Sequence, residues 1–345
     1  MLPPGAMFGP IFRAAQVGFP CRGAWPVFVG GENALHRAAV ALPAISGGQV
    51  AGLRYTSRAI PGGKMEKVRL QRLFNRTSHR TLIVAIDHAL FNNTAFLPGI
   101  ENMAKAVKTV ADAAADGVLL SVGEAPHLQR LPGRDKAGLM LRVDPANFYN
   151  DDLPSSQLHC RVMDNAVETA LRLDAACILL NLLQIDEHPE MLNQCVENVL
   201  RVKNDCDRYG MPLGIEPLSF KKTKGGGYVG DGDPKRVTTL ARMAAELGAD
   251  IIKTDSTEPE EEFHRVIEAA TGVPVTVRGG SKASDKEVLE HTERLVGQGV
   301  AGLIYGRNII QHKNPAAMTR ALQGVLHGGL SAKQALKQLT AERSK

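Results

Sequence analysis

The sequence predicts a single (β/α)8 barrel, an α/β fold in which parallel strands alternate with helices. From residue 80 onward, short apolar runs of about five residues alternate with amphipathic segments over about 240 residues. Parallel neighbours need a helical crossover, and the pattern supplies one after each run. An open doubly wound sheet uses the same alternation, but paired glycine-rich signals after the last two runs favour the closed barrel.

The apolar runs are nearly continuous in valine, isoleucine and leucine. This composition is typical of strands that are buried on both faces, as in a barrel covered by helices. The predicted strands are Leu82–Ile86, Gly117–Ser121, Gly138–Val143, Ala176–Leu180, Pro212–Ile215, Ala249–Ile252, Pro274–Val277 and Val300–Ile304.

Three predicted helices begin with recognisable capping residues. Asp233 precedes Pro234, which places a side-chain cap and a first-turn proline ahead of apolar residues at helical spacing. Ser284 and Glu287 have the spacing of a capping box. A third helix is expected to begin after Asn314.

Residues 1–64 are expected to form a poorly structured extension, and residues 65–345 the barrel domain. The extension is rich in Gly, Pro, Ala and Arg, and it shows no sustained helical or strand period. Its six basic residues and single acid resemble an organelle transit sequence. A disordered extension, or translation that begins at Met65, explains the same composition. The fold prediction therefore rests on residues 65–345 alone.

The charge distribution excludes one class of partner. The chain has 345 residues and a formal net charge of +5, but residues 65–345 contain equal numbers of basic and acidic side chains. A phosphate-backbone binding surface has no electrostatic support there, so no nucleic-acid partner is expected. No run approaches the roughly 18 apolar residues of a membrane span, so no membrane partner is expected.

The cysteines indicate a reducing environment. Five of them are scattered along the chain without a CxxC pair, which argues against a disulfide framework and against a metal site. A cytoplasmic location without a metal or other cofactor is the expectation.

Polar side chains follow nearly every predicted strand, at the end where barrel enzymes carry their chemistry. Packing alone does not require this pattern. The side chains are Asp87, His88, Glu124, Arg142, Asp144, Asn181, Glu216, Lys253, Thr254, Asp255, Arg278, Ser281, Arg307 and Asn308.

Lys253 is the most informative of them. It directly follows the run Ala249–Ile252, so its stem is expected to lie against the barrel wall. Apolar surroundings remove water from an ammonium group and favour the neutral amine, which attacks a carbonyl to form a Schiff base. The protonated imine stabilises a carbanion on the adjacent carbon. The alternative is a lysine that reaches solvent from the strand end, or that pairs with Asp255.

Carbanion chemistry also needs a group that moves protons. Glu216 and Asp87 each follow a predicted strand, and a carboxyl group against an apolar wall can be tuned for this role. His88 is expected to contact the substrate or its phosphate and is a further acid–base candidate. The alternative for each is a structural ion pair or a hydrogen-bonded wall residue.

Two turns predict a phosphate site. Gly279, Gly280 and Ser281 follow the seventh strand, where glycine exposes backbone N–H groups to a close ligand. Gly306 and Arg307 follow the eighth strand, and a guanidinium can bind phosphate in bidentate fashion. Barrels commonly bind phosphate at this position. Two glycine turns that merely leave the strands are the alternative.

A loop over residues 221–232 is predicted after the fifth strand. It contains three lysines and a run of three glycines, and both a mobile flap over an anionic substrate and a merely solvated loop fit this composition.

Four segments resemble the class I aldolases of the DeoC/LacD superfamily, especially the branch of archaeal-type fructose-bisphosphate aldolases. The resemblance covers about residues 70–330. The segments are Ala85–His88, Asp250–Thr254, Arg278–Ser281 and Tyr305–Gln311.

The resemblance implies a Schiff-base role for Lys253, phosphate binding by the two glycine turns and Arg307, and contacts between Asp87 and substrate hydroxyls. Archaeal-type enzymes have a tyrosine followed by proline after the fifth strand, whereas here Glu216 precedes Pro217. A glutamate at that position is similar to tagatose-bisphosphate and sulfosugar-phosphate aldolases. Members of the family tend to form homo-oligomers.

The predicted function is a metal-independent aldolase of glycolysis or related carbohydrate metabolism. Its phosphorylated ketose would be fructose 1,6-bisphosphate, cleaved to dihydroxyacetone phosphate and glyceraldehyde 3-phosphate. The alternatives are a Schiff-base lyase or transferase that acts on another ketose phosphate, and a barrel that binds a sugar phosphate without turning it over.

Overall fold

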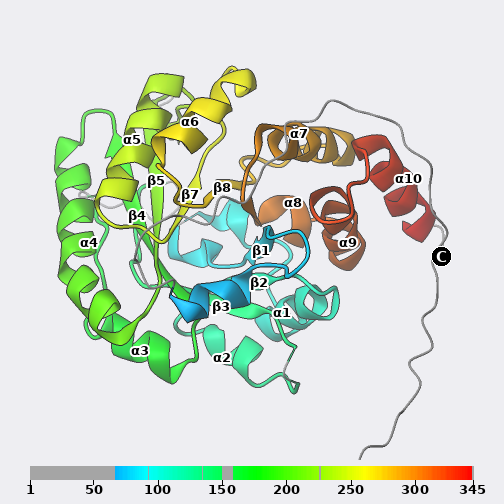
Figure 1. Ribbon diagram of the computed structural model, residues 1–345, viewed down its shortest axis with the longest axis horizontal. Coiled ribbons are helices and arrows are strands. Elements are labelled where there is room, and N and C mark those ends of the chain that lie inside the picture. Colours follow the sequence, from blue (N-terminus) through cyan, green and yellow to red (C-terminus); the bar gives the residue numbers. More distant parts are fainter. Residues whose placement is uncertain (1–66, 92, 134, 150–157, 225–226, 344–345) are drawn as a thin grey trace, which may run out of the picture. The chain divides into compact units, whose positions relative to one another are not determined.

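Parallel strands close into a barrel in the computed structural model, which describes residues 67–91, 93–133, 135–149, 158–224 and 227–343 (Figure 1). The strand order is β4-β3-β2-β1-β9-β8-β7-β5, and pairing between β4 and β5 completes the ring. All the pairs in the ring are parallel, which confirms the predicted (β/α)8 fold.

Each predicted run corresponds to a strand of the barrel. The strands are β1 (Thr81–Ala85), β2 (Gly117–Ser121), β3 (Gly138–Arg142), β4 (Cys177–Ile185), β5 (Leu213–Lys222), β7 (Ile251–Thr254), β8 (Val275–Arg278) and β9 (Gly302–Tyr305).

Strands β4 and β5 are longer than predicted. They pair continuously from Ile178 opposite Leu213 to Ile185 opposite Phe220. The predicted runs end where the polar residues Asn181 and Glu216 interrupt the apolar sequence, but these two residues stand opposite one another within the ladder. Backbone pairing therefore continues past side chains that the apolar pattern treated as strand ends.

Helices lie outside the ring of strands, and α10 packs beyond the ring against α7 and α9 (Figure 1). The α-helices are α1 (Met103–Asp112), α2 (Ala125–Gln129), α3 (Ala166–Arg172), α4 (Pro189–Tyr209), α5 (Pro234–Glu246), α6 (Phe263–Ala269), α7 (Asp285–Gln298), α8 (Arg307–Ile310), α9 (Pro315–Leu326) and α10 (Ala332–Arg343). Short 3₁₀ helices span Val68–Leu73, His88–Phe91, Thr94–Phe96 and Glu260–Glu262.

The predicted caps are confirmed. The side chain of Asp233 accepts a hydrogen bond from the backbone N–H of the third residue of α5. Ser284 and Glu287 form a complete capping box at the start of α7. The side chain of Asn314 accepts a hydrogen bond from a backbone N–H in the first turn of α9. These bonds satisfy donors that have no partner inside the helix.

The barrel interior is apolar at the end where the strands begin. Leu73, from the 3₁₀ helix ahead of β1, is fully buried with Ile83, Leu119, Met140 and Ile304. A larger apolar layer fills the space between the strands and the helices. The buried charged side chains of Asp87, Arg142, Glu216 and Lys253 lie toward the opposite end, where the strands finish.

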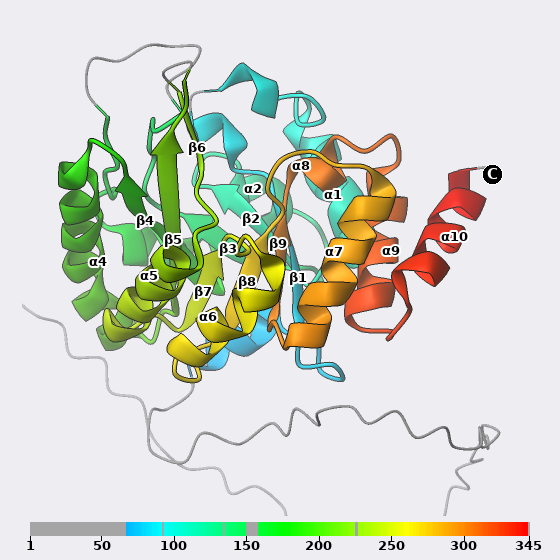
Figure 2. The same cartoon turned by 90° about the horizontal axis from the view of Figure 1, so that it is seen from above.

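The segment predicted as a loop after the fifth strand is instead a β-hairpin. Strand β5 continues to Lys222 and pairs antiparallel with β6 (Tyr228–Gly230), which lies beside the upper end of β5 in Figure 2. Lys222 contacts Glu187 at 2.6 Å, and Lys221 contacts Asp231 at 3.5 Å. Backbone pairing thus extends into the glycine-rich segment, and two of its lysines are paired with acids of the same chain.

Residues 1–66 lie outside the described residues, so the predictions for the extension and for the domain boundary at residue 65 remain predictions. Within the described part of the chain, no helix is both long and apolar enough to cross a membrane. No group of three or more histidine, cysteine or acidic residues is arranged there to bind a metal ion.

A pair of glycine substitutions tests how tightly β9 packs against β1. A Cβ atom on Gly302 would lie 2.2 Å from the carbonyl oxygen of Thr81, whereas a Cβ on Gly297, in α7, would meet nothing within 4 Å. We expect Gly302→Ala to lower the free energy of unfolding by about 3 kcal/mol. We expect Gly297→Ala to raise it by about 0.5 kcal/mol. Urea unfolding followed by circular dichroism measures both, and equal effects would contradict this packing.

Candidate active site

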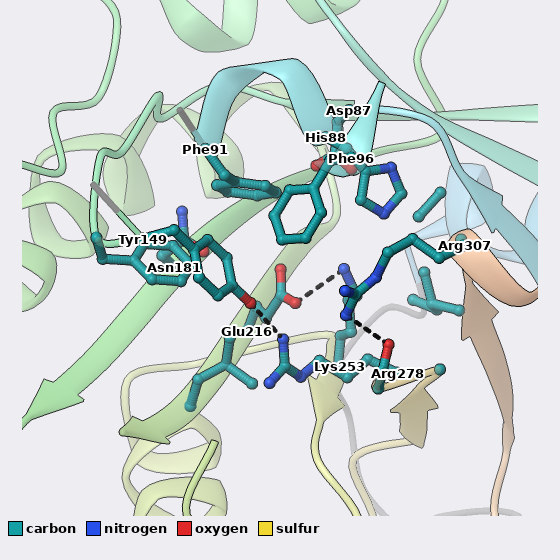
Figure 3. A pocket seen from close by; sticks show the side chains of 17 residues that line it. Asp87, His88, Phe91, Phe96, Tyr149, Asn181, Glu216, Lys253, Arg278 and Arg307 are labelled. Atoms are coloured by element: carbon teal, nitrogen blue, oxygen red, sulfur yellow. Dashed lines mark hydrogen bonds and ion pairs between the residues drawn. The ribbon is translucent and has the colours of Figure 1, made fainter. Parts of the chain in front are cut away.

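Polar side chains from several strands meet in one cavity at the carboxyl end of the barrel (Figure 3). Asp87 follows β1, Asn181 lies in β4, Glu216 in β5, Lys253 in β7 and Arg278 at the end of β8. Neighbouring parallel strands end at the same edge, so residues far apart in sequence come together here. The cavity also contains Gly279, Gly280, Gly306, Arg307 and His88.

Lys253 points into this cavity and not into bulk solvent. The residue is 5% exposed, and its Nζ lies 2.8 Å from Oε1 of Glu216. Asp255, the partner considered from the sequence, instead pairs with Arg278. An amine and a carboxylate at hydrogen-bond distance can exchange a proton directly, which is the geometry that a nucleophilic lysine and its base require.

Arg142, from β3, connects three buried carboxylates. Its Nε lies 2.9 Å from Asp87, and one Nη lies 3.4 Å from Asp144. The other Nη forms an ion pair with Oε2 of Glu216. Glu216 is therefore paired on one oxygen with Lys253 and on the other with Arg142.

These contacts set the protonation of the cluster. Burial alone raises the pKa of Glu216, but Lys253 and Arg142 outweigh it and lower the pKa to about 2. Burial also dominates at Asp144 and raises its pKa to about 6, against the opposing charge of Arg142. Glu216 is accordingly ionised at neutral pH, and its pKa moves in the opposite direction from that expected of a carboxyl group against an apolar wall, because two cations contact it.

His88 begins the 3₁₀ helix after β1 and lies on the cavity wall (Figure 3). Burial lowers the pKa of its imidazole to about 4, so the ring is neutral at pH 7. The ring packs directly on Gly306, where a Cβ atom would lie 2.2 Å from Cε1 of His88. A side chain at position 306 would displace this ring from its buried position. Gly306 therefore has a packing role in addition to any contact with a ligand.

The two glycine turns are joined through Asn308. Its amide donates hydrogen bonds to the carbonyl oxygens of Gly279 at 2.7 Å and Ser281 at 3.2 Å, and its Oδ1 accepts one from Ala283. Gly280 adopts a φ of 58°, which glycine permits at low energy. The turns after β8 and β9 thus form a single connected wall.

Arg307 lies on this wall beside the cavity. Its guanidinium packs 4.7 Å above the ring of Phe96 and donates a hydrogen bond of 2.7 Å to the carbonyl oxygen of Gly280. No carboxylate within 4.0 Å pairs with it among the described residues, in contrast to Arg142 and Arg278. Its charge is therefore available to an anionic ligand. Ser281 does not line this cavity but an adjoining pocket, which shares Arg307 and Gly280 with it and also contains Tyr228 and Gly230 of β6.

Sequence patterns did not indicate two parts of the site. The sequence analysis assigned no function to Arg142, because its partners Asp87 and Glu216 are distant from it along the chain. The aromatic wall of Phe91, Phe96, Phe148 and Tyr149 lies in two short 3₁₀ helices after β1 and in the segment after β3, which are too short for a periodic pattern to mark buried residues. Tyr149 also accepts a hydrogen bond of 3.2 Å from Arg278.

A closed barrel with a buried lysine–carboxylate pair at the ends of its strands defines a barrel enzyme. The DeoC/LacD family aldolase model matches residues 81–312, from the start of β1 to just past α8, and the chain belongs to this family. The resemblance seen in the sequence is thereby confirmed. The protein is an aldolase-type carbon–carbon lyase, and the family implies a phosphorylated sugar as substrate.

Two curated relatives show the range of reactions in this family. The chain is 30% identical over 268 residues to the 3-hydroxy-5-phosphonooxypentane-2,4-dione thiolase of Klebsiella pneumoniae subsp. pneumoniae, covering 77% of this chain and 83% of that protein. It is 29% identical over 261 residues to the 2-amino-3,7-dideoxy-D-threo-hept-6-ulosonate synthase of Halobacterium salinarum, covering 75% and 91%.

Solved structures share the fold. An archaeal fructose 1,6-bisphosphate aldolase matches with a TM-score of 0.62 and 25% identity, covering 76% of this chain and 99% of that one. A second structure, of an archaeal fructose-1,6-bisphosphate aldolase, has the catalytic lysine covalently bound to the carbinolamine intermediate of the substrate. It matches with a TM-score of 0.64 and 24% identity, covering 75% and 98%.

Replacing Arg142 by methionine tests the buried cluster. The substitution leaves three carboxylates without their shared cation, and we expect the free energy of unfolding at pH 7 to fall by about 3 kcal/mol. In the native protein, the lowered pKa of Glu216 stabilises the fold above about pH 4.5, and this stabilisation disappears as the pH falls toward 2. In the variant, protonation of the carboxylates relieves the destabilisation. The difference between the two proteins in urea unfolding should therefore narrow as the pH is lowered from 7 to 4, and a constant difference would contradict this account.

Proposed function

We propose that the protein cleaves and forms a carbon–carbon bond in a phosphorylated ketose through a Schiff base on Lys253, with fructose 1,6-bisphosphate as the first substrate to test. The observation that carries the proposal is the contact of 2.8 Å between Lys253 and Glu216, in a cavity shared with Gly279, Gly280 and Arg307. The proposed products are dihydroxyacetone phosphate and glyceraldehyde 3-phosphate.

The first step converts the ion pair into a nucleophile. Lys253 transfers a proton to Glu216, and the neutral amine attacks the C2 carbonyl carbon. A proton then moves from the nitrogen to the former carbonyl oxygen. Glu216 returns its proton to the resulting hydroxyl group, which leaves as water. A protonated imine and an ionised Glu216 remain.

The second step breaks the C3–C4 bond. Glu216 accepts the proton of the C4 hydroxyl group, the C4–O bond becomes a carbonyl, and the electron pair of the C3–C4 bond moves to C3. The imine nitrogen accepts electron density and forms a neutral enamine. Return of a proton to C3 and hydrolysis of the imine release the second product and restore the amine.

The remaining predicted residues have binding roles in this proposal. Arg307, Gly279, Gly280 and Ser281 contact a phosphate group, for which the guanidinium without a carboxylate partner supplies the charge. Asp87 lines the cavity and accepts a hydrogen bond from a substrate hydroxyl. A homo-oligomer in the cytoplasm remains the prediction from the sequence.

A transferase is the second candidate, and the activities for which the relatives are named favour it. The thiolase acts on a phosphorylated dione and the synthase makes a heptulosonate, so family members handle the carbon fragment in different ways. Product analysis with fructose 1,6-bisphosphate separates the candidates. Release of free dihydroxyacetone phosphate supports the lyase, whereas turnover only with an added acceptor supports the transferase.

Borohydride reduction tests the nucleophile. Incubation with dihydroxyacetone phosphate and sodium borohydride should inactivate the protein and add the mass of the reduced adduct to the peptide that contains Lys253. The matched control is Lys221→Arg, which changes a lysine of the hairpin and should leave the labelling intact. Lys253→Arg should abolish it. Labelling at another lysine, or full activity of Lys253→Arg, would contradict the proposal.

Replacing Glu216 by glutamine tests the base. The amide keeps the shape of the side chain but cannot accept a proton, so kcat for cleavage should fall by about 100-fold or more. Binding of the phosphorylated ketose should change less, because the phosphate contacts are untouched. Steady-state kinetics with fructose 1,6-bisphosphate measures both parameters, and a change confined to KM would assign Glu216 to binding alone.

A further inference from the structure

Asn181 presents a buried acceptor that has no partner. The residue is 0% exposed, lies in β4 opposite Glu216 in β5, and lines the cavity beside it (Figure 3). Its Oδ1 makes no hydrogen bond to any described residue. An unpaired buried carbonyl oxygen destabilises a fold, and such groups are rare in native proteins. The unpaired Oδ1 atom therefore indicates that a ligand donates a hydrogen bond to it.

The orientation of the amide follows from its other contacts. The Nδ2 group donates to the carbonyl oxygen of Asp144 at 3.4 Å and approaches Sγ of Cys160 at 3.9 Å. A carbonyl oxygen only accepts hydrogen bonds, so the nitrogen of the amide must face Asp144. The backbone N–H of Asn181 also donates to Asp144, at 2.5 Å, which fixes the residue in place. Oδ1 is thereby left for the cavity.

The neighbouring groups exclude a partner from the protein. Lys253 and Arg142 are the cations of the buried cluster, and each forms an ion pair with Glu216. Arg142 forms two further ion pairs, with Asp87 and with Asp144. Nδ1 of His88, on the opposite wall, is likewise buried without a partner. The cavity thus contains two polar atoms, from β4 and from the segment after β1, that a ligand can satisfy.

We infer that Asn181 determines substrate specificity by accepting a hydrogen bond from a hydroxyl group of the carbon chain, other than the hydroxyl that Glu216 deprotonates. This inference rests on the proposed function and deepens it. A polyhydroxylated ketose phosphate supplies the required O–H donor. A dione presents a carbonyl oxygen instead, and two acceptors facing one another leave both unpaired. The site accordingly selects sugar phosphates over diketone phosphates.

Deoxy substrates test the inference. We compare cleavage of fructose 1,6-bisphosphate with that of its 3-deoxy and 5-deoxy analogues, in the native protein and in Asn181→Leu. A site that hydrogen-bonds a substrate hydroxyl rejects the analogue that lacks it, and we expect the native kcat/KM to fall by about 100-fold or more for one of the two analogues. In Asn181→Leu this preference should shrink to about tenfold or less.

The preference is the ratio of kcat/KM for fructose 1,6-bisphosphate to kcat/KM for the deoxy analogue, both measured on the same preparation of a variant. The ratio therefore does not depend on what fraction of that variant is folded. The matched control is Asn198→Leu. Asn198 is also a buried asparagine beside Cys160, but both ends of its side-chain amide have partners. Its Nδ2 donates a hydrogen bond of 2.8 Å to the carbonyl oxygen of Cys160, and its Oδ1 accepts one of 3.3 Å from the backbone N–H of Val162. That variant should retain the native preference.

The outcomes separate this inference from the proposed function. Borohydride trapping on Lys253 with an unchanged preference in Asn181→Leu would overturn the role of Asn181 and leave the Schiff base intact. Absence of trapping and cleavage with all three ketoses in the native protein would overturn both. A preference that disappears only in Asn181→Leu supports the inference.

Discussion

The pairing of Glu216 with two cations is the interaction on which the rest of the site depends. Removing a carboxylate from water is unfavourable by several kcal/mol, and only close opposite charges and hydrogen bonds compensate for it. Lys253 and Arg142 supply these from β7 and β3, on either side of β5. The barrel must therefore be closed, with its strands in register, before this carboxylate can be buried and ionised.

The two ends of the barrel have different physical roles. Leu73 and the apolar residues around it exclude water from the end where the strands begin, and they make the interior a rigid support. The polar residues occupy the other end, where Lys253 is 5% exposed and Glu216 is 3% exposed. The short 3₁₀ helices after β1 and the segment after β3 contribute aromatic rings to the wall of this cavity. Electrostatic interactions are stronger in such a site because little water screens them.

The fold and the polar end of the barrel were predictable from local patterns, whereas the contacts within the site were not. Buried parallel strands are uniformly apolar, and so the eight runs and the position of Lys253 after one of them are visible in the sequence. Arg142 and Glu216 are 74 residues apart, and nothing local marks them as partners. The hairpin was mistaken for a loop because its glycines and lysines are typical of loops, while its strand character comes from pairing with β5.

The charge of the buried cluster explains why one carboxylate can serve every step of the proposed cycle. In the resting state Lys253 carries one positive charge and Glu216 one negative charge. When the amine is free, both are neutral. The protonated imine again faces an ionised Glu216, and the enamine again faces a neutral one. The sum for the pair is zero throughout, so the buried site never gains or loses a net charge, which would be unfavourable in a poorly hydrated interior. Arg142 keeps its charge at every stage and is the fixed partner against which these protons move.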